Sequence, residues 1–421
     1  MSKNLFRLCL LLILVLCFAA VPIVSAQNLV KLKFACWDYE VNDYDRQLIA
    51  EFERLNPNIQ VEVYDIPASE YPDKMLIMLA GGEDVDVFYA KDPTMYGGLV
   101  LRKQIRPLDD LIARDGLDLT GYGGSLDNVI LDNMIYGLPY RSDFWILFYN
   151  KTLFDRFGVE YPTNDWTWND FRETALKLTS GQGASRTYGT YIHTWASTYF
   201  LFGLQKAEGD LVEGSYEMLR DGLELAYNIQ MVDKSAADYA ANRSMGAHYR
   251  GLFEQGNIGM LYMGTWFMQA LIQDAKDGRH DVQWGIVRMP QWEGLEHATI
   301  GNVTPVVINS KTQKLEAAWA LAKFLGGSEG AAILANNVIV PGYMDDSVLA
   351  TFAGIEGFPK DETDALVTNQ VFMEWPPHRL AGLLGNMVEE EIVLAMTGNK
   401  TIHQAIKDME SRRQEIIMLN P

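Results

Sequence analysis

Aromatic and polar residues recur in this chain where predicted strands end or loops begin, a placement typical of a ligand cleft. They are Trp37, Asp38, Tyr39, Asp92, Tyr140, Arg141, Trp266, Trp375 and Arg379. Sugars have apolar C–H faces that stack on aromatic rings, and hydroxyl rims that pair with carboxylate, amide and guanidinium groups. Each residue also has a structural interpretation: Trp37 in a core, Asp92 as a helix N-cap, Arg141 in a surface ion pair. Only their shared placement indicates binding.

The stretch over residues 253–267 gives one of these side chains its most definite placement. An apolar run at 258–263 is short enough for a buried strand, Gly264 breaks it, and Thr265 is a suitable N-cap for a following helix. Trp266 is then expected in the first helical turn at the carboxyl end of the strand, where open α/β sheets bind ligands. The alternative is that Trp266 covers a core layer, and both interpretations stay open.

Motifs for catalysis or metal binding are absent from the sequence. It contains no H-E-x-x-H, C-x-x-C, G-x-S-x-G or G-x-x-x-x-G-K-[ST], and its six histidines are scattered. Neighbouring carboxylates occur at Asp84 and Asp86, at Asp109 and Asp110, and at residues 389–391. Solvated faces explain them better than glycosidase chemistry. The sequence therefore predicts a protein that is not an enzyme and that uses no cofactor and no metal.

The first 26 residues have the form of a signal peptide. Lys3 and Arg7 precede an apolar run, and Val24-Ser25-Ala26 is a small-residue cleavage site. Cys17 lacks the small residues expected before a lipidated cysteine, so cleavage after Ala26 is favoured over a lipid or uncleaved anchor. We expect export to the periplasm or to the extracellular face of the cytoplasmic membrane. Cys36 is then the only cysteine left, and we expect it to be a buried structural thiol.

Charge and length narrow the class further. The net charge of −20 argues against nucleic acid or an anionic membrane surface as a partner. A chain of 421 residues suggests two domains or lobes. Predicted strands near residues 30–34, 59–63 and 85–90 alternate with helical patterns near 48–55 and 69–80. This rhythm predicts an α/β fold with a parallel, helix-covered sheet. Further strands are expected near 144–149, 258–263, 282–287 and 303–308. After residue 342 the chain is expected to form helices and no strand.

Five blocks of sequence form an ordered set. They are V-K-L-K-F-A-C-W with F-E-R-L-N-P-N-I-Q-V-E-V, Y-G-L-P-Y with F-Y-N-K-T-L-F-D-R-F-G-V, T-W-N-D-F, F-E-Q-G-N-I-G-M-L-Y-M-G-T-W, and A-A-W-A-L-A-K-F-L. In this order they resemble the family-1, sugar-type extracellular solute-binding proteins that serve ABC importers. The resemblance runs from about residue 29 to the last predicted helix.

The resemblance implies a type II periplasmic-binding fold, in which two α/β lobes joined by three crossovers hold a ligand between them. The N-terminal lobe would comprise residues 27–139 and 304–337, and the C-terminal lobe residues 140–303 and 338–421. By position, the ligand contacts would be Trp37, Asp38, Asp92, Tyr140, Trp266, Gly301 and Trp375; Asn302, Tyr39, Arg141 and Arg379 complete the candidate set. The lobes would close at hinges near residues 138–140, 301–305 and 337–342, where Gly and Pro cluster.

The expected function is that of a monomeric receptor that captures a mono- or oligosaccharide and presents it to the permease of an ABC importer. The same fold could instead bind a glycerol phosphate ester or a polyamine. A phosphate would require several cationic groups, and the sequence offers Arg141 and Arg379 as candidates. A third and weaker alternative is an exported enzyme that cleaves glycans.

Overall fold

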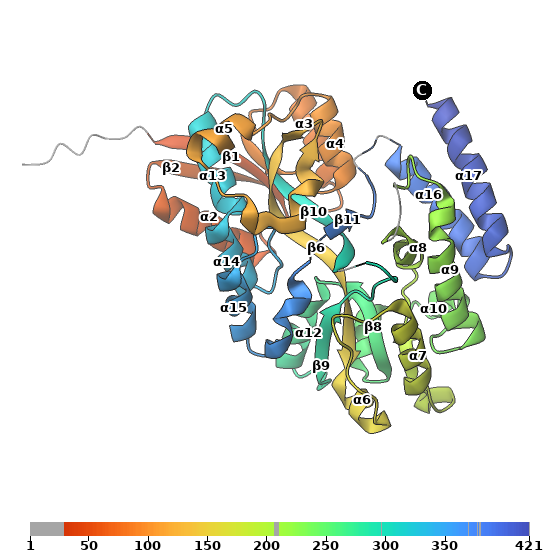
Figure 1. Ribbon diagram of the computed structural model, residues 1–421. Helices are drawn as coiled ribbons and strands as arrows, with labels where there is room; N and C mark the ends of the chain where they lie inside the picture. Colours follow the sequence, from red (N-terminus) through yellow and green to blue (C-terminus); the bar gives the residue numbers. More distant parts are fainter. Residues whose placement is uncertain are drawn as a thin grey trace, which may run out of the picture.

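The computed structural model describes residues 29–205, 210–295, 297–368, 370–376, 378 and 380–420. The predicted signal peptide and the candidate Arg379 lie outside these residues. Within the described part, the larger sheet has nine strands in the order β2-β1-β3-β10-β6-β8-β7, with β11 paired to β10 and β9 paired to β6. Helices surround this sheet (Figure 1). The prediction of an α/β fold is confirmed.

The N-terminal part follows the predicted alternation of strands and helices. Strand β1 (Val30–Trp37) is followed by α2 (Asp43–Leu55), β2 (Ile59–Ile66), α3 (Tyr71–Gly81) and β3 (Val87–Tyr89). Strand β1 pairs in parallel with both β2 and β3. Helices α4 (Pro93–Leu101) and α5 (Asp109–Asp115) come next. Because parallel strands direct their carboxyl ends to one edge, the residues that follow β1 and β3 lie at the same edge of the sheet.

Strands β6 (Gly137–Asn150) and β10 (Ala298–Ile308) are longer than the sequence pattern predicts. They pair antiparallel, with Gly301 opposite Phe144, and the register shifts beyond Thr304. Each strand continues through one of the predicted hinges, near residues 138–140 and 301–305. The two strands stay paired there because Pro139 and Pro305 lie opposite one another where the register shifts. At Gly301 a Cβ atom would lie 2.4 Å from the Asp143 carbonyl oxygen, so close strand approach requires glycine there.

The buried hydrophobic residues form two clusters that these long strands connect. The N-terminal core takes residues from β1 to Tyr140 and from Val303 to Ile339, and the C-terminal core takes most of the rest, beginning at Phe144. Figure 1 shows β6 running from the group of elements around β1 and α3 to the group around β8 and α12. The lobe boundaries at residues 139, 303 and 337 stay a prediction, which this division of the cores supports.

The C-terminal part contains the strands β7 (Tyr188–Tyr191), β8 (Ile258–Gly264), β9 (Trp284–Arg288) and β11 (Gln370–Met373) and the helices α6 (Lys151–Phe157), α7 (Trp168–Leu178), α8 (Ser197–Leu204), α9 (Arg220–Tyr227), α10 (Tyr239–Ser244), α11 (Tyr249–Glu254), α12 (Phe267–Lys276), α16 (Ala381–Met396) and α17 (Ile402–Leu419). Helices α13 (Leu315–Gly326), α14 (Ser328–Asn336) and α15 (Asp346–Gly354) precede β11. The expectation of helices alone after residue 342 is wrong, because β11 pairs in parallel with β10.

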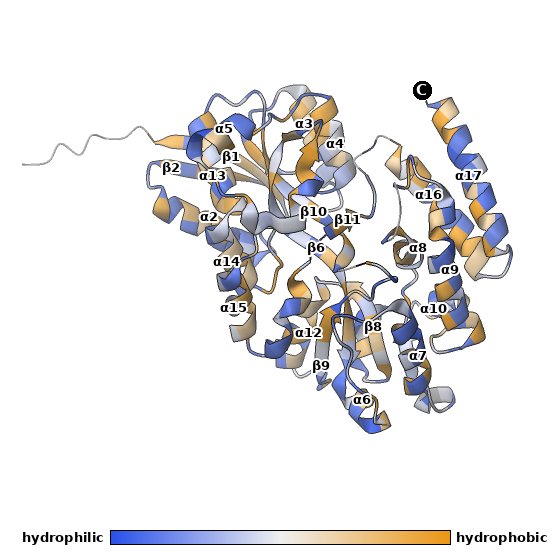
Figure 2. Cartoon of the chain, in the orientation of Figure 1, coloured by the Kyte–Doolittle hydropathy of each residue, from blue (hydrophilic) through white to orange (hydrophobic). Residues whose placement is uncertain are grey.

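The hydropathy of the residues differs between the inner strands and the outer helices. Figure 2 shows hydrophobic colours along the inner strands and mixed colours on outer helices such as α17. Helix α17 buries Ala405, Ile406 and Met409, spaced as one helical face. No helix among the described residues has both the length and the apolar composition that crossing a membrane requires.

Candidate ligand-binding cleft

A hollow of about 450 Å³, here called the cleft, lies between elements of the two cores. Asp92, at the start of α4, lines one side of it. Trp195, Asn302, Glu374 and Trp375 line the other side, together with α16. Indole faces and carboxylate or amide groups thus meet in one concave site, the combination that holds small polar ligands.

Asp92 caps a helix and also lines the cleft, so it fits both interpretations that the sequence left open. As the N-cap of α4 its carboxylate accepts a hydrogen bond of 2.8 Å from the Met95 amide, and it also faces the cleft. Burial lowers the pKa of the neighbouring Lys91. The charges of Asp38 and Asp92 oppose this shift, whereas the charge of Arg141 adds to it. The structure therefore brings three of the predicted residues to the surroundings of one lysine.

The segment after β1 is held rigidly at this edge. Trp37 packs edge-on against Tyr71 and Tyr89, with ring centroids 5.1 and 5.7 Å away. Asp38 has a left-handed backbone (φ 51°), and its carboxylate accepts a hydrogen bond of 2.9 Å from the Ala68 amide. The Tyr39 amide donates to Asp65 at 2.9 Å. Trp37, Asp38 and Tyr39 remain partly exposed but do not line the cleft, and their role in ligand contact stays a prediction.

Tyr140 is not at the cleft surface. Only 1% of it is exposed, its ring stacks on Tyr89 at 4.1 Å, and its hydroxyl donates to Asp45 at 2.8 Å. Burial raises the pKa of Asp45 to about 6, although the hydrogen bonds from Tyr140 and Tyr89 oppose the rise. The position suggested for ligand contact is therefore filled by a core residue in this conformation.

Arg141 forms a half-buried ion pair rather than a surface one. Its guanidinium donates to Asp143 at 2.6 and 2.9 Å and to the Tyr44 hydroxyl at 3.3 Å. Burial opposes its charge, but the field of Asp143 and the surrounding hydroxyls holds the pKa of Arg141 above its ordinary value. Since its donors are engaged by Asp143, Arg141 is poorly placed to neutralise an anionic ligand.

Glu374 is a candidate that the sequence interpretation missed. The Trp145 indole Nε1 donates to its carboxylate at 2.6 Å, and Asn302 hydrogen-bonds to it as well. Burial raises the pKa of Glu374, those two hydrogen bonds lower it, and Asp143 raises it again. A carboxylate fixed in this way can accept hydrogen bonds from ligand hydroxyls without reorganising. The only sequence signal was its position directly before Trp375.

Trp266 lies beside the cleft and does not line it. Its indole meets Trp145 edge-on at 5.6 Å and lies 6.4 Å from Trp195. The prediction of Thr265 as a helix N-cap is wrong: Trp266 occupies that position without a side-chain cap, and the Thr265 hydroxyl accepts from the Phe144 amide at 3.4 Å. The Thr265 hydroxyl thus bonds to the β6 backbone instead of to the first turn of α12.

Two further tryptophans supply the exposed aromatic surface of the cleft. Trp195, which the sequence interpretation missed, is 41% exposed and packs edge-on against His193 at 4.4 Å. Trp375 packs against Phe200 at 5.8 Å and lies over Gly385, where a Cβ atom would be 3.4 Å from its ring. An indole with this much exposure has the open face that stacking on a ligand requires. The sequence pattern predicted a helix over residues 191–204, but Trp195 lies in the loop between β7 and α8.

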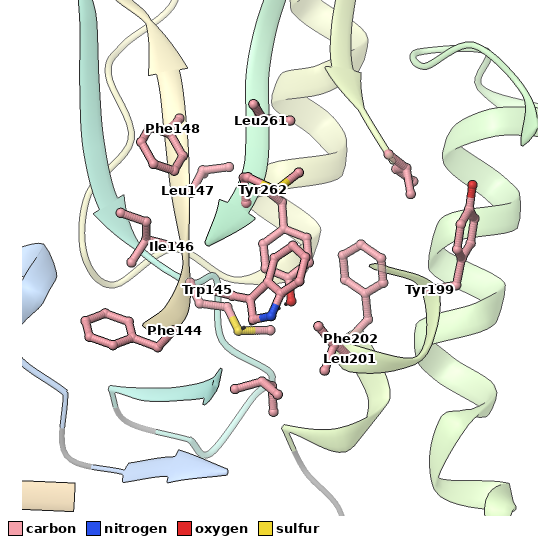
Figure 3. Packing of buried hydrophobic residues seen from close by; sticks show 14 of the residues in the cluster. Phe144, Trp145, Ile146, Leu147, Phe148, Tyr199, Leu201, Phe202, Leu261 and Tyr262 are labelled. Carbon is pink, nitrogen blue, oxygen red and sulfur yellow. Dashed lines mark hydrogen bonds between the residues drawn. The ribbon is translucent and has the colours of Figure 1, made fainter. Parts of the chain in front are cut away.

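The remaining predictions concern Gly301, cysteine and metals. Gly301 is buried between strands, so its contribution is the close approach of β10 to β6. Cys36 is buried as expected, and burial raises the pKa of its thiol well above the ordinary range. Among the described residues no group of three or more His, Cys, Asp or Glu side chains is arranged to hold a metal ion. Figure 3 shows the core around Trp145, whose ring lies 4.8 Å from that of Tyr262, which in turn packs against Phe202 at 5.2 Å.

Comparison with other proteins agrees with this geometry. A model of the bacterial extracellular solute-binding proteins matches residues 40–332. A putative binding protein of Brucella abortus is 21% identical over 301 residues, which cover 70% of this chain and 71% of the relative.

Two solved structures extend the likeness to nearly the whole chain. A sugar transporter of Rhizobium etli, described as an open conformation, has a TM-score of 0.88 and 35% identity, over 91% of this chain and 99% of the other. The sugar-binding protein MalE of Xanthomonas citri has a TM-score of 0.77 and 21% identity, over 92% and 98%. The type II periplasmic-binding fold is thereby confirmed, and this chain belongs to the bacterial extracellular solute-binding protein family.

Proposed function

We propose that the protein captures a mono- or oligosaccharide in the cleft and delivers it to the permease of an ABC importer. The observation that carries the proposal is the meeting of Trp195 and Trp375 with Glu374, Asn302 and Asp92 in one hollow. The indoles suit the C–H faces of a sugar, and the fixed carboxylates and amide suit its hydroxyls. The names of the similar Rhizobium etli and Xanthomonas citri structures support a sugar.

The cationic groups near the cleft favour a carbohydrate over a phosphate ester. Lys91 donates to the Ala68 carbonyl and has its pKa lowered by burial, and Arg141 is paired with Asp143. A phosphate would need donors that are free of such partners. A polyamine remains the competing ligand for a hollow with three acidic residues, Asp92, Glu374 and Glu389.

We also propose that the two lobes close on the ligand. The crossovers would lie near residues 138–140, 301–305 and 337–342, where the chain passes between the two cores. Closure would bring Asp92 toward Trp375 and exclude water between them. Small-angle scattering with and without the ligand should show a smaller radius of gyration when the ligand is bound. An unchanged radius would contradict closure.

A thermal-shift screen against mono- and oligosaccharides, glycerol phosphate esters and polyamines tests the ligand class. A true ligand at a hundred times its Kd should stabilise the fold by about 2.7 kcal/mol. Stabilisation by a sugar and by neither other class is the expected result. Oligosaccharide hits should then be incubated with the protein and assayed for new reducing ends. New ends would contradict a pure binding role, and stabilisation by polyamines alone would replace the sugar.

A further inference from the structure

A second hollow, of about 320 Å³, lies on the other side of β6 and is here called the rear groove. Its walls are the turn at residues 120–125, Ser142 and Phe144 of β6, residues 340–349 and residues 366–371. Successive side chains of a strand point to opposite faces, so Ser142 and Phe144 face away from Arg141, Asp143 and Trp145. Figure 3 shows Phe144 and Trp145 on opposite sides of β6. The rear groove therefore uses the face of β6 opposite to Trp145, whose indole donates to the cleft residue Glu374.

Ser142 brings a buried hydroxyl without a hydrogen-bond partner among the described residues to the rear groove. It is 4% exposed, and its Oγ atom has no hydrogen-bond partner among the described residues. Its backbone amide is satisfied, because it donates to the Val340 carbonyl at 3.0 Å. The Ser125 hydroxyl, which is also buried in the groove, donates to the Gly342 carbonyl at 2.7 Å. A buried hydroxyl without a partner is unfavourable, so Ser142 is available to a ligand group.

The rest of the rear groove combines an apolar wall with negative charge. Phe144, Met344 and Leu349 supply the apolar side chains, and Asp345 and Asp346 lie at the start of α15. The Asp345 carboxylate accepts from the Ser347 and Val348 amides at 2.9 and 3.0 Å. The described lining residues include no Lys or Arg. A positively charged ligand with an apolar body therefore fits these walls better than an anion.

We propose that the rear groove is a second binding site, for a small amphiphilic amine that also carries a hydroxyl group. The hydroxyl pairs with Ser142 Oγ, the apolar body packs on Phe144 and Leu349, and the ammonium group lies near Asp345 and Asp346. This proposal does not depend on the sugar proposed for the cleft, because the residues that line the rear groove and those that line the cleft are different.

Calorimetric titration with tyramine as the probe tests the site on the purified protein. Tyramine should bind saturably at one site, and phenethylamine, which lacks the hydroxyl, should bind at least fivefold more weakly. Ser142→Ala should weaken tyramine at least fivefold and leave phenethylamine unchanged. The melting temperature of Ser142→Ala should stay level or rise, since no internal hydrogen bond is lost. 4-Hydroxyphenylacetate, with a carboxylate in place of the amine, should bind much more weakly than tyramine.

Thr190→Val is the matched control. Thr190 Oγ1 is also buried without a hydrogen-bond partner among the described residues, but it lies in β7 and does not line the rear groove. This variant should bind tyramine like the wild type. Trp375→Ala should also leave tyramine binding unchanged, because Trp375 lines the cleft. Absence of saturable tyramine binding, equal binding by Ser142→Ala, or loss of binding in Trp375→Ala would each overturn the proposal.

Discussion

The two faces of β6 between Arg141 and Trp145 differ in how their polar groups are satisfied. On the cleft face Arg141 pairs with Asp143, and Trp145 donates to Glu374. On the rear face the Ser142 hydroxyl has no partner among the described residues. The polar groups on the cleft face, including the cleft residue Glu374, are thus already hydrogen-bonded, whereas the rear groove contains a buried hydroxyl without a partner. Fixed groups favour tight and selective binding because little ordering is left to do.

The largest expected effect is at Glu374. Glu374→Ala removes the acceptor that Trp145 and Asn302 hold in place, and hydrogen bonds to a charged group contribute about 1.5–3 kcal/mol each. We expect sugar affinity to fall about a hundredfold or more, equal to roughly 2.8 kcal/mol. Calorimetry with the sugar found in the screen measures it. Glu389→Ala, at the rim of the cleft, is the control and should change affinity only a few-fold; an equal loss in both variants would contradict the assignment.

The aromatic residues come next. Stacking on a sugar is taken to contribute about 1–3 kcal/mol, by analogy with bases on aromatic side chains. Trp195→Ala should therefore weaken binding tenfold to a hundredfold and leave stability unchanged, since the indole is 41% exposed. If Trp266, which lies beside the cleft, is a stacking platform, Trp266→Ala should weaken binding to a similar degree, and Trp266→Phe should weaken it less.

Denaturant melts on the same variants separate the two roles of Trp266. If Trp266 belongs to the core, its loss should cost about 3–5 kcal/mol of stability while the folded protein binds normally. That result would leave Trp195 and Trp375 as the aromatic platform of the cleft.

These residues also show what a single sequence can predict. The strands with alternating hydrophobic residues, β1 and β2, followed from the local pattern. The placement of Trp37, Asp38 and Asp92 at one edge of the sheet followed from the rule that parallel strands direct their carboxyl ends to the same edge. Glu374 and Trp195 did not, because their placement depends on β11 pairing with β10 and on the packing of a loop, neither of which has a local signal. Tyr140 misled for the same reason: only the tertiary fold shows Asp45 beneath it.

A pH titration sharpens the comparison further. Burial holds the pKa of Glu374 above its ordinary value of 4.5. Sugar affinity should fall, by about tenfold overall, as the pH is lowered through that raised pKa, because a protonated Glu374 loses acceptor strength. Stability without ligand should change in the opposite sense: the folded state holds the proton more tightly than the unfolded state, so unfolding free energy falls as the pH rises through the same window. Glu374→Gln should flatten both curves, and an unaltered pH dependence in that variant would assign them to another group.

The smallest expected effect links the two faces of β6. Lobe closure over the cleft must change the rear groove, because its walls include the turn at residues 120–125 from the N-terminal part and α15 from the C-terminal part. Tyramine that fits the groove of this conformation, which is similar to a structure described as open, should therefore oppose closure and weaken sugar binding by about fivefold. Reciprocity requires that saturating sugar weaken tyramine by the same factor. Paired titrations measure both factors, and Ser142→Ala should abolish the effect of a fixed tyramine concentration, whereas Thr190→Val should preserve it. Equal sugar affinity with and without bound tyramine would show that the rear groove and the cleft act independently.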